Sequence, residues 1–572
     1  MNPLLPVARR LLGLSPRRHR SAFRTEWLRL SDGVRLATTV VQPVASDAPR
    51  APAILVRTAS AAHARSHPAL LWCRILAESG YVVVVQECRG RHASEGEFTP
   101  FEGEVRDGRE TIEWIAGQEW FDGRLGLVGC GYSGFTAWSA LAEAPESVGA
   151  LAVAMATRDP HALLYPGGAF ALCNGLTWGV GLGEREAPPA HRLDLERAFR
   201  FRPIREADRV ALRQVDWFRA WLDHPRPDAF WDRVTPPLPA MPPPTLLVAG
   251  WYDGALGPQL DDYAALAQAS RDAGSPAPEL VAGPWSAPLR GGAGIGAWAE
   301  PLRSCLSFLG RHLQGAEERA APVRVFVRGE RRWFNAPVWP IPDSADRTLY
   351  LHSGGHANSL AGDGELHADP PHASQSPDRF VYDPADPVPT RGGCLPGGRG
   401  DPADQRAVES RDDVLCYTTR PLSEDMVVIG RVRVELFAAS NAPDTDFTAK
   451  LVDVAPDGFA AHLCDGALRG RWRDGATAPL WLEPDAPQAL EIDLWATAVR
   501  LRAGHRIRLE VSSSNFPRFD RNPNARADPA HANAEESAPA RQTVHHDPDH
   551  PSRLVLPVAA ADPRSSPGTA VG

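Results

Sequence analysis

The sequence lacks three features that would place it in a specialised class of protein. Its eight cysteines form no Cys-x-x-Cys pair, so neither a zinc site nor a disulfide framework is indicated, and reduced thiols in a cytoplasmic protein are expected. It has no apolar run long enough to span a membrane and no apolar stretch of signal-peptide length near its start. It has no excess of positive charge either, because the formal net charge is −9. Nucleic acid and stable membrane insertion are therefore not expected.

The 572 residues, 43% of them hydrophobic, are typical of a globular protein with two or three domains. Apolar runs alternate with helical periods up to about residue 318, and this pattern predicts an α/β fold with a parallel sheet. Period-2 alternation then predicts a β-sandwich. The expected segments are a flexible basic tail (1–22), an α/β core (23–158 and 234–318), an aromatic and arginine-rich helical cap (159–233), a β-sandwich (319–558) and a flexible tail (559–572).

One short stretch, Leu125–Trp138, carries the strongest functional signal. It reads LGLVGCGYSGFTAW: an apolar strand, a corner with three glycines, and an apolar helix. This is the frame of the α/β-hydrolase nucleophile elbow, in which Gly-x-Ser-x-Gly exposes a serine above a sheet. The position that should hold the serine is Gly131.

Several longer motifs accompany this corner. They are DGVRL (32–36), QECRGRHASEGEF (86–98), AGWYDG (249–254), GPWS (283–286), DTDFTAKLVDV (444–454) and SSSNFPRFDRN (512–522). With these motifs the chain resembles the cocaine esterase / X-Pro dipeptidyl-peptidase (CocE/NonD) family of α/β-hydrolases. The resemblance implies an α/β-hydrolase core with an inserted helical cap and a C-terminal jelly-roll. It also implies hydrolysis of esters or amides by a serine–histidine–aspartate triad.

The resemblance places two of the three triad positions on residues that cannot do this chemistry. The serine position is Gly131, the histidine position after GPWS is Ala287, and the aspartate position is kept as Asp253. The position of a tyrosine that assists the oxyanion falls on Ser60. A glycine has no hydroxyl to attack a carbonyl and an alanine accepts no proton, so standard serine-hydrolase chemistry is predicted to be absent. The fold should tolerate the change, because glycine readily adopts the strained elbow conformation.

Other groups near the corner offer substitutes. Ser133, two residues late, is expected in the first helical turn, where an ordinary helix-start role competes with that of a nucleophile. Cys130 is expected to be a buried, inert thiol. Four histidines come from segments that could approach a pocket: His63, His67, His92 and His161. The expected pocket walls are Tyr132, Tyr165, Trp178, Trp251 and Trp285.

Three functions are therefore open. The protein is a non-hydrolytic enzyme of specialised metabolism in which Asp253 shuttles protons, a pseudoenzyme that binds a ligand without turnover, or an ester or amide hydrolase that uses Ser133 or another arrangement. Because all the lost side chains are replaced by smaller ones, we expect an enlarged pocket for a small-molecule or peptide-like ligand. No cofactor and no metal are indicated, and a homo-oligomer is left open.

Overall fold

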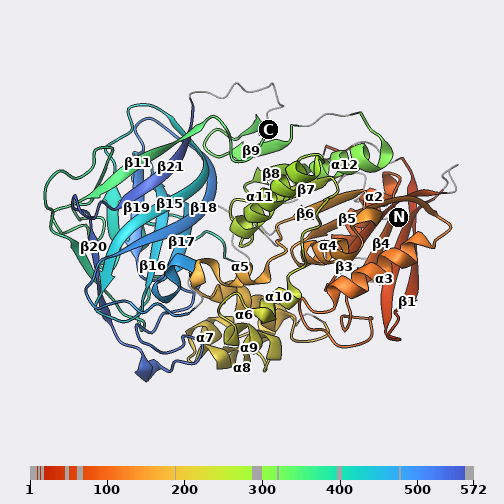
Figure 1. Ribbon diagram of the computed structural model, residues 1–572, viewed down its shortest axis with the longest axis horizontal. Helices are drawn as coiled ribbons and strands as arrows, with labels where there is room; N and C mark the ends of the chain where they lie inside the picture. The colour runs from red at the N-terminus through yellow and green to blue at the C-terminus, as the bar shows by residue number, and fades with distance from the viewer. Residues whose placement is uncertain are drawn as a thin grey trace.

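The computed structural model describes residues 9–10, 13–14, 18–44, 50–60, 68–186, 188–286, 299–317, 321–395, 402–475 and 478–560. Two large β-sheets lie at opposite ends of the molecule, and a group of short helices fills the space beside them (Figure 1). The α/β-hydrolase fold with a C-terminal β-rich domain is thereby confirmed. Most of the predicted N-terminal tail, and residues 561–572, lie outside the described residues.

The first sheet has the strand order β1-β2-β4-β3-β5-β6-β7-β8-β9-β10. Strands β3 to β9 run parallel, and the antiparallel hairpins β1–β2 and β9–β10 form the two edges. The strands are β1 Arg20–Arg29, β2 Arg35–Val44, β3 Ala51–Thr58, β4 Val82–Glu87, β5 Phe121–Cys130, β6 Ala150–Ala154, β7 Thr245–Gly250, β8 Glu279–Gly283, β9 Val323–Val327 and β10 Arg332–Ala336. Apolar runs on the central strands are buried because helices cover both faces of the sheet.

The covering helices bury two separate apolar clusters. Residues of α3 (Glu104–Ala116), α4 (Tyr132–Glu143) and α11 (Leu256–Ala273) pack on one face of the sheet. Residues of α2 (Pro68–Glu78) and α12 (Ala299–Gln314) pack on the other. Parallel strands put their carboxyl ends at one edge, where ligands bind in open α/β sheets. The ends of β5, β6, β7 and β8 therefore share the edge that carries the elbow.

Short helices interrupt the alternation between β6 and β7 and have an aromatic core of their own. They are α5 Pro160–Leu164, α6 Leu172–Gly181, α7 Leu195–Arg200, α8 Ala207–Ala211, α9 Asp216–Asp223 and α10 Ala229–Val234. Their core includes Phe170, Phe218, Trp221 and Trp231, together with Phe135 of α4. The cap is thus packed directly on the helix that follows the elbow.

The second sheet forms the β-rich domain, with its own apolar core. Its strands are β11 Ser344–His352, β12 Glu365–His367, β13 Asp378–Tyr382, β14 Leu415–Thr418, β15 Met426–Ser440, β16 Asp446–Val454, β17 Ala460–Arg469, β18 Gln488–Leu501, β19 Arg506–Ser512, β20 Ala540–His545 and β21 Arg553–Ala559, with the short helix α13 Arg406–Glu409. Trp495 of β18 lies in one cluster with α11, so the two domains share buried contacts. None of the described helices combines the length and apolarity needed to cross a membrane.

The structure corrects two predicted boundaries. Residues 323–336 were expected in the sandwich, yet β9 pairs in parallel with β8 and extends the first sheet. The alternating pattern of Val323–Val327 indicates a strand with one buried face. An outer strand of either sheet would have this pattern, so it could not predict to which sheet the strand belongs. Strand β1 begins at Arg20, inside the predicted tail, because its pairing with β2 continues to Val44.

Candidate functional site

The corner after β5 has the backbone geometry of a nucleophile elbow. Gly131 joins β5 to α4 with φ 57° and ψ −128°, and its N–H donates to the carbonyl of Ala154 (3.0 Å). A Cβ built on Gly129 would lie 1.9 Å from the carbonyl oxygen of Ser133, and one on Gly134 would lie 2.6 Å from the Cβ of Ala156. Both glycines are therefore required for close packing. A Cβ on Gly131 meets nothing within 4 Å, so a side chain there would enter open space.

A buried polar network fixes the elbow from behind. The hydroxyl of Tyr132 donates to Glu104 Oε1 (2.9 Å) and accepts from the N–H of Phe101 (2.9 Å). Glu104 Oε2 pairs with Arg57 Nη1 at 2.8 Å, and both side chains are almost wholly buried. Burial raises the pKa of Glu104, although the Arg57 charge opposes the shift. The Tyr132 hydroxyl thus acts as both donor and acceptor in hydrogen bonds within the protein. Its role is to stabilise the elbow.

The retained aspartate lies beside the elbow. Asp253 follows β7, is 5% exposed, and accepts through Oδ1 from the N–H of Ala255 (2.9 Å). The Cys394 thiol, from the β-rich domain, donates to its backbone carbonyl (3.4 Å). Burial, with the nearby negative charge of Asp253, raises the pKa of the Cys130 thiol to about 12. Cys130 is half-buried rather than buried, and its inertness stays a prediction. Asp253 is near enough to the end of β5 to act on this thiol electrostatically.

The other positions suggested by the resemblance are less informative. Ala287 lies outside the described residues, which end in that loop at the buried Ser286. Ser60 follows β3 directly and is exposed, and its N–H donates to Thr58 Oγ1 (3.0 Å). The role of Ser60 as a remnant of an oxyanion site stays a prediction.

The structure gives no support to Ser133 as a nucleophile. It lies in the first turn of α4, half-buried, with its carbonyl bonded by Thr136 Oγ1 (2.9 Å). Within the described ranges no histidine hydrogen-bonds to its hydroxyl. His161 Nε2 contacts the carbonyl of Pro225 (3.3 Å) and its ring stacks on Tyr165 inside the cap.

Of the remaining candidate histidines, His92 is the one that lies among the described residues. The backbone N–H of His92 donates to the carbonyl of Arg185 (3.1 Å), which fixes that loop. His63 and His67 lie outside the described residues.

A Ser–His–Asp cluster exists in the β-rich domain, but its geometry is not that of a triad. Ser353 Oγ bonds Asp378 directly (2.8 Å) and contacts His546 Nε2 (3.1 Å). Asp378 contacts the same ring nitrogen (2.9 Å), whereas a triad needs the carboxylate on the other nitrogen. Nδ1 of His546 faces Gln375 instead (2.9 Å). This network is a satisfied polar core.

Tyr132, one of the predicted wall aromatics, belongs to the elbow itself, and Trp178 lies against it. Its ring lies 5.4 Å from that of Tyr132 and stacks on Trp221 of the cap. Tyr165 donates its hydroxyl to the carbonyl of Trp221 (2.9 Å) within the cap core.

The two wall tryptophans that follow sheet strands are packed into the core. Trp251 Nε1 donates to the carbonyl of Phe326 (3.0 Å), and Trp285 packs over Gly283 and beside Trp333. A wall role for Tyr165, Trp251 and Trp285 stays a prediction.

Comparison with known proteins agrees with this architecture in both domains. The family model of the X-Pro dipeptidyl-peptidase (S15 family) matches residues 32–286. The model of the X-Pro dipeptidyl-peptidase C-terminal non-catalytic domain matches residues 314–555. The cocaine esterase of Rhodococcus sp. (strain MB1 Bresler) is 38% identical over 568 residues, covering 92% of this chain and 97% of that protein.

Solved structures extend the likeness to nearly the whole chain. An α-amino acid ester hydrolase is 26% identical with a TM-score of 0.82, covering 94% of this chain and 97% of that one. An aminopeptidase from the marine sediment archaeon Thaumarchaeota archaeon has the same TM-score at 24% identity, over 96% and 98%, and shows the shared fold. The elbow geometry, the order of the strands and these matches lead to one conclusion: the chain belongs to the cocaine esterase / X-Pro dipeptidyl-peptidase (CocE/NonD) family of α/β-hydrolases.

Proposed function

We propose that this protein is a non-hydrolytic member of its family, which binds a small molecule in the inherited acyl pocket and forms no acyl-enzyme. The observation that carries the proposal is Gly131 at the crest of an otherwise complete elbow, with open space where the serine hydroxyl would stand. Acyl transfer needs a nucleophile at this point and a base within hydrogen-bond reach. At the two positions that the resemblance assigns to these groups, the sequence has Gly131 and Ala287 instead.

The group proposed to do chemistry in this pocket is Asp253. A buried carboxylate at the carboxyl edge of the sheet is suited to take and return a proton in a cyclisation, elimination or isomerisation. Support comes from its burial and from its electrostatic influence on Cys130, which immediately precedes the elbow residue. Its bond from the N–H of Ala255 holds the carboxylate in a fixed direction. We propose a carbonyl compound as the substrate, similar in size to the acyl groups that the family's hydrolases accept.

A serine-directed probe tests the missing nucleophile. Purified wild-type protein is treated with a fluorophosphonate and with p-nitrophenyl acetate, beside Ser133→Ala and the double variant Gly131→Ser/Ala287→His. We expect no covalent adduct on the wild type, and labelling with ester turnover in the double variant. A wild-type adduct that disappears in Ser133→Ala would overturn the proposal in favour of a hydrolase.

A second experiment tests the role of Asp253. Aryl esters, lactones and N-acyl amino acid amides are screened by thermal shift, and each binder is incubated with protein and analysed by mass spectrometry for isomerised or dehydrated product. We expect Asp253→Asn to bind the same compounds and to lose product formation by 10²-fold or more, a size that is typical of general acid–base groups, roughly 10²–10⁴. Binding without product in both proteins would refute the proton-transfer role and leave a ligand-binding pseudoenzyme.

A further inference from the structure

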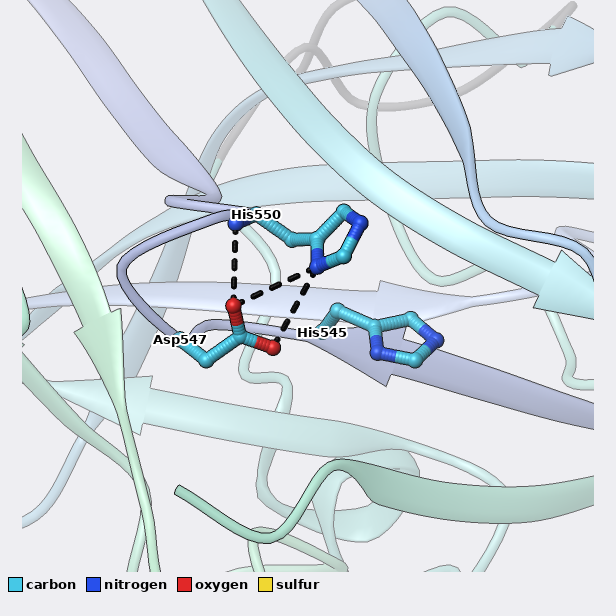
Figure 2. A group of neighbouring side chains, drawn as sticks. All are labelled: His545, Asp547 and His550. Atoms are coloured by element: carbon cyan, nitrogen blue, oxygen red, sulfur yellow. Dashed lines mark hydrogen bonds and ion pairs between the residues drawn. The ribbon is translucent and has the colours of Figure 1, made fainter. Parts of the chain in front are cut away.

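The connection from β20 to β21 brings together two imidazoles and a carboxylate that the elbow chemistry does not involve. His545 ends β20, and Asp547 and His550 follow in the turn, all three half-buried. One donor atom from each of the three lies within 4.8 Å of the others. Figure 2 shows both rings beside the Asp547 carboxylate. Figure 1 places β20 at the end of the β-rich domain remote from α4, so this cluster is separate from the elbow.

The separation between Asp547 and His550 suits two ligands of one metal ion as well as a long hydrogen bond. His550 Nδ1 lies 3.2 and 3.3 Å from the two carboxylate oxygens. A charge-assisted N–H···O bond is shorter, about 2.7–2.9 Å. Two ligands of a tetrahedral zinc ion, with bonds of about 2.0–2.1 Å, stand about 3.3 Å apart. Bringing the farthest donor of the trio to this separation requires a shift of at most about 1.5 Å.

The backbone around the cluster is fixed by bonds that leave the metal-facing atoms available. Asp547 Oδ1 accepts from the N–H groups of Asp549 (2.9 Å) and His550 (3.0 Å), which orients the carboxylate. The carbonyl of His545 accepts from Ser552 Oγ (2.6 Å). His546, pointing to the other face of the strand, is anchored in the buried network with Asp378 (2.9 Å). Such supporting bonds are what holds ligands in place in metal sites.

His545 has a further property that the turn alone does not explain. Its Nε2 atom is enclosed and has no hydrogen-bond partner among the residues that the structure describes. A buried polar atom without a partner costs free energy, so an imidazole is not placed there for the sake of the hairpin.

From this geometry we propose that His545, Asp547 and His550 bind a divalent transition-metal ion, zinc in the first place. Imidazole nitrogens select borderline ions such as Zn²⁺, whereas Mg²⁺ and Ca²⁺ prefer sites made of oxygen. Three protein ligands leave the fourth tetrahedral position to water. The bound ion joins the end of β20 to the turn before β21 and thereby stabilises this part of the β-rich domain.

The test measures zinc retained by tag-free, full-length protein. After equilibration with Zn²⁺ and dialysis, metal content is read by mass spectrometry, and Co²⁺ titration monitors the visible bands of four-coordinate cobalt. The wild type is expected to hold about one equivalent. His545→Ala and Asp547→Asn should bind at least about tenfold more weakly, since even supporting residues are worth 10–100-fold. Asparagine at 547 keeps an oxygen for the two backbone N–H groups, so the turn persists.

The matched control is His531→Ala. His531 is exposed and pairs with Asp528 three residues earlier (3.3 Å), but it has no second histidine in a metal-binding group among the described residues. Zinc retention in this variant should equal that of the wild type. No retention by the wild type, or equal retention by His545→Ala and the wild type, would overturn the proposal. Near-ultraviolet circular dichroism and the urea midpoint verify that each variant is folded.

Discussion

Gly131→Ser asks whether the elbow can still carry the side chain that the family places there. A Cβ at this position meets nothing within 4 Å, so the substitution introduces no clash. The remaining cost comes from the backbone, because a residue with a Cβ at φ 57° is strained by about 1–2 kcal/mol. We therefore expect the free energy of unfolding to fall by about 1–2 kcal/mol, with the fold intact.

Gly129→Ser, two residues earlier, provides the contrast. Its Cβ would stand 1.9 Å from the carbonyl oxygen of Ser133, a backbone atom in the first turn of α4. The turn would have to move to relieve this contact, and a loss above about 4 kcal/mol, in the exceptional range for point mutations, is expected. The same chain thus contains one glycine that is dispensable for packing and one that is not.

Urea unfolding of both variants and of Gly131→Ala, followed by circular dichroism, gives the comparison. Alanine and serine at 131 should agree to within about 0.5 kcal/mol, because the hydroxyl faces open space and only the Cβ is strained. If Gly131→Ser lost as much stability as Gly129→Ser, the serine side chain at 131 would have to clash with other atoms, and the space above the elbow would not be open. The proposed pocket at that point would then be wrong.

Three further predictions concern groups around the same edge. Burial raises the pKa of Asp262 from 3.8 to about 7, so the folded state holds a proton that the unfolded state releases, and this contribution to stability is lost as pH rises from about 4 to 7. Urea unfolding of the wild type should show this fall in the free energy of unfolding, and the Asp262→Asn variant should show less of it. Tyr132→Phe should lose about 1–3 kcal/mol in the same assay, because Glu104 and the N–H of Phe101 lose their buried partner. Cys130, with its pKa raised to about 12 by burial and Asp253, should resist iodoacetamide at pH 7.5 in the folded protein, as read by mass spectrometry after digestion.

The elbow could be predicted from sequence because every signal for it is local. Leu125 and Leu127 mark a buried strand, and the apolar period that starts at Phe135 marks a helix. The glycines between the strand and the helix allow the sharp turn of a nucleophile elbow. The bond from Tyr132 to Glu104 has no such local signal, because the two residues lie 28 positions apart.

The packing of two wall tryptophans was not predictable from their positions along the chain. Trp251 and Trp285 each follow an apolar strand at the ligand edge, and a side chain there can turn back onto the sheet. Trp285 lies over Gly283, where a Cβ would approach its ring to 2.6 Å. The glycine two residues before the tryptophan was the available signal.

The cysteine spacings that indicate zinc sites give no signal for the histidine cluster, because its three residues are His545, Asp547 and His550. His545 is the last residue of β20, Asp547 follows two residues later, and His550 comes three residues after that in the same turn. A His-x-Asp-x-x-His pattern at the end of a strand was therefore readable in the sequence. The sequence does not give the separation of 3.2–3.3 Å between His550 Nδ1 and the Asp547 oxygens, which matches the spacing of two ligands on one ion.

Persistence of the elbow in this chain does not by itself argue for catalysis. A glycine at 131 relieves the strain that a serine would impose, and Gly129 and Gly134 are held by close packing in any case. The corner would therefore be kept by folding alone. Evidence for function must come from side chains that are not required for folding. The proton-transfer test at Asp253 asks whether this carboxylate is such a side chain. Its bond from Ala255 serves the loop, but an asparagine oxygen would accept the same bond. A loss of product in Asp253→Asn with stability unchanged would consequently separate chemistry from architecture.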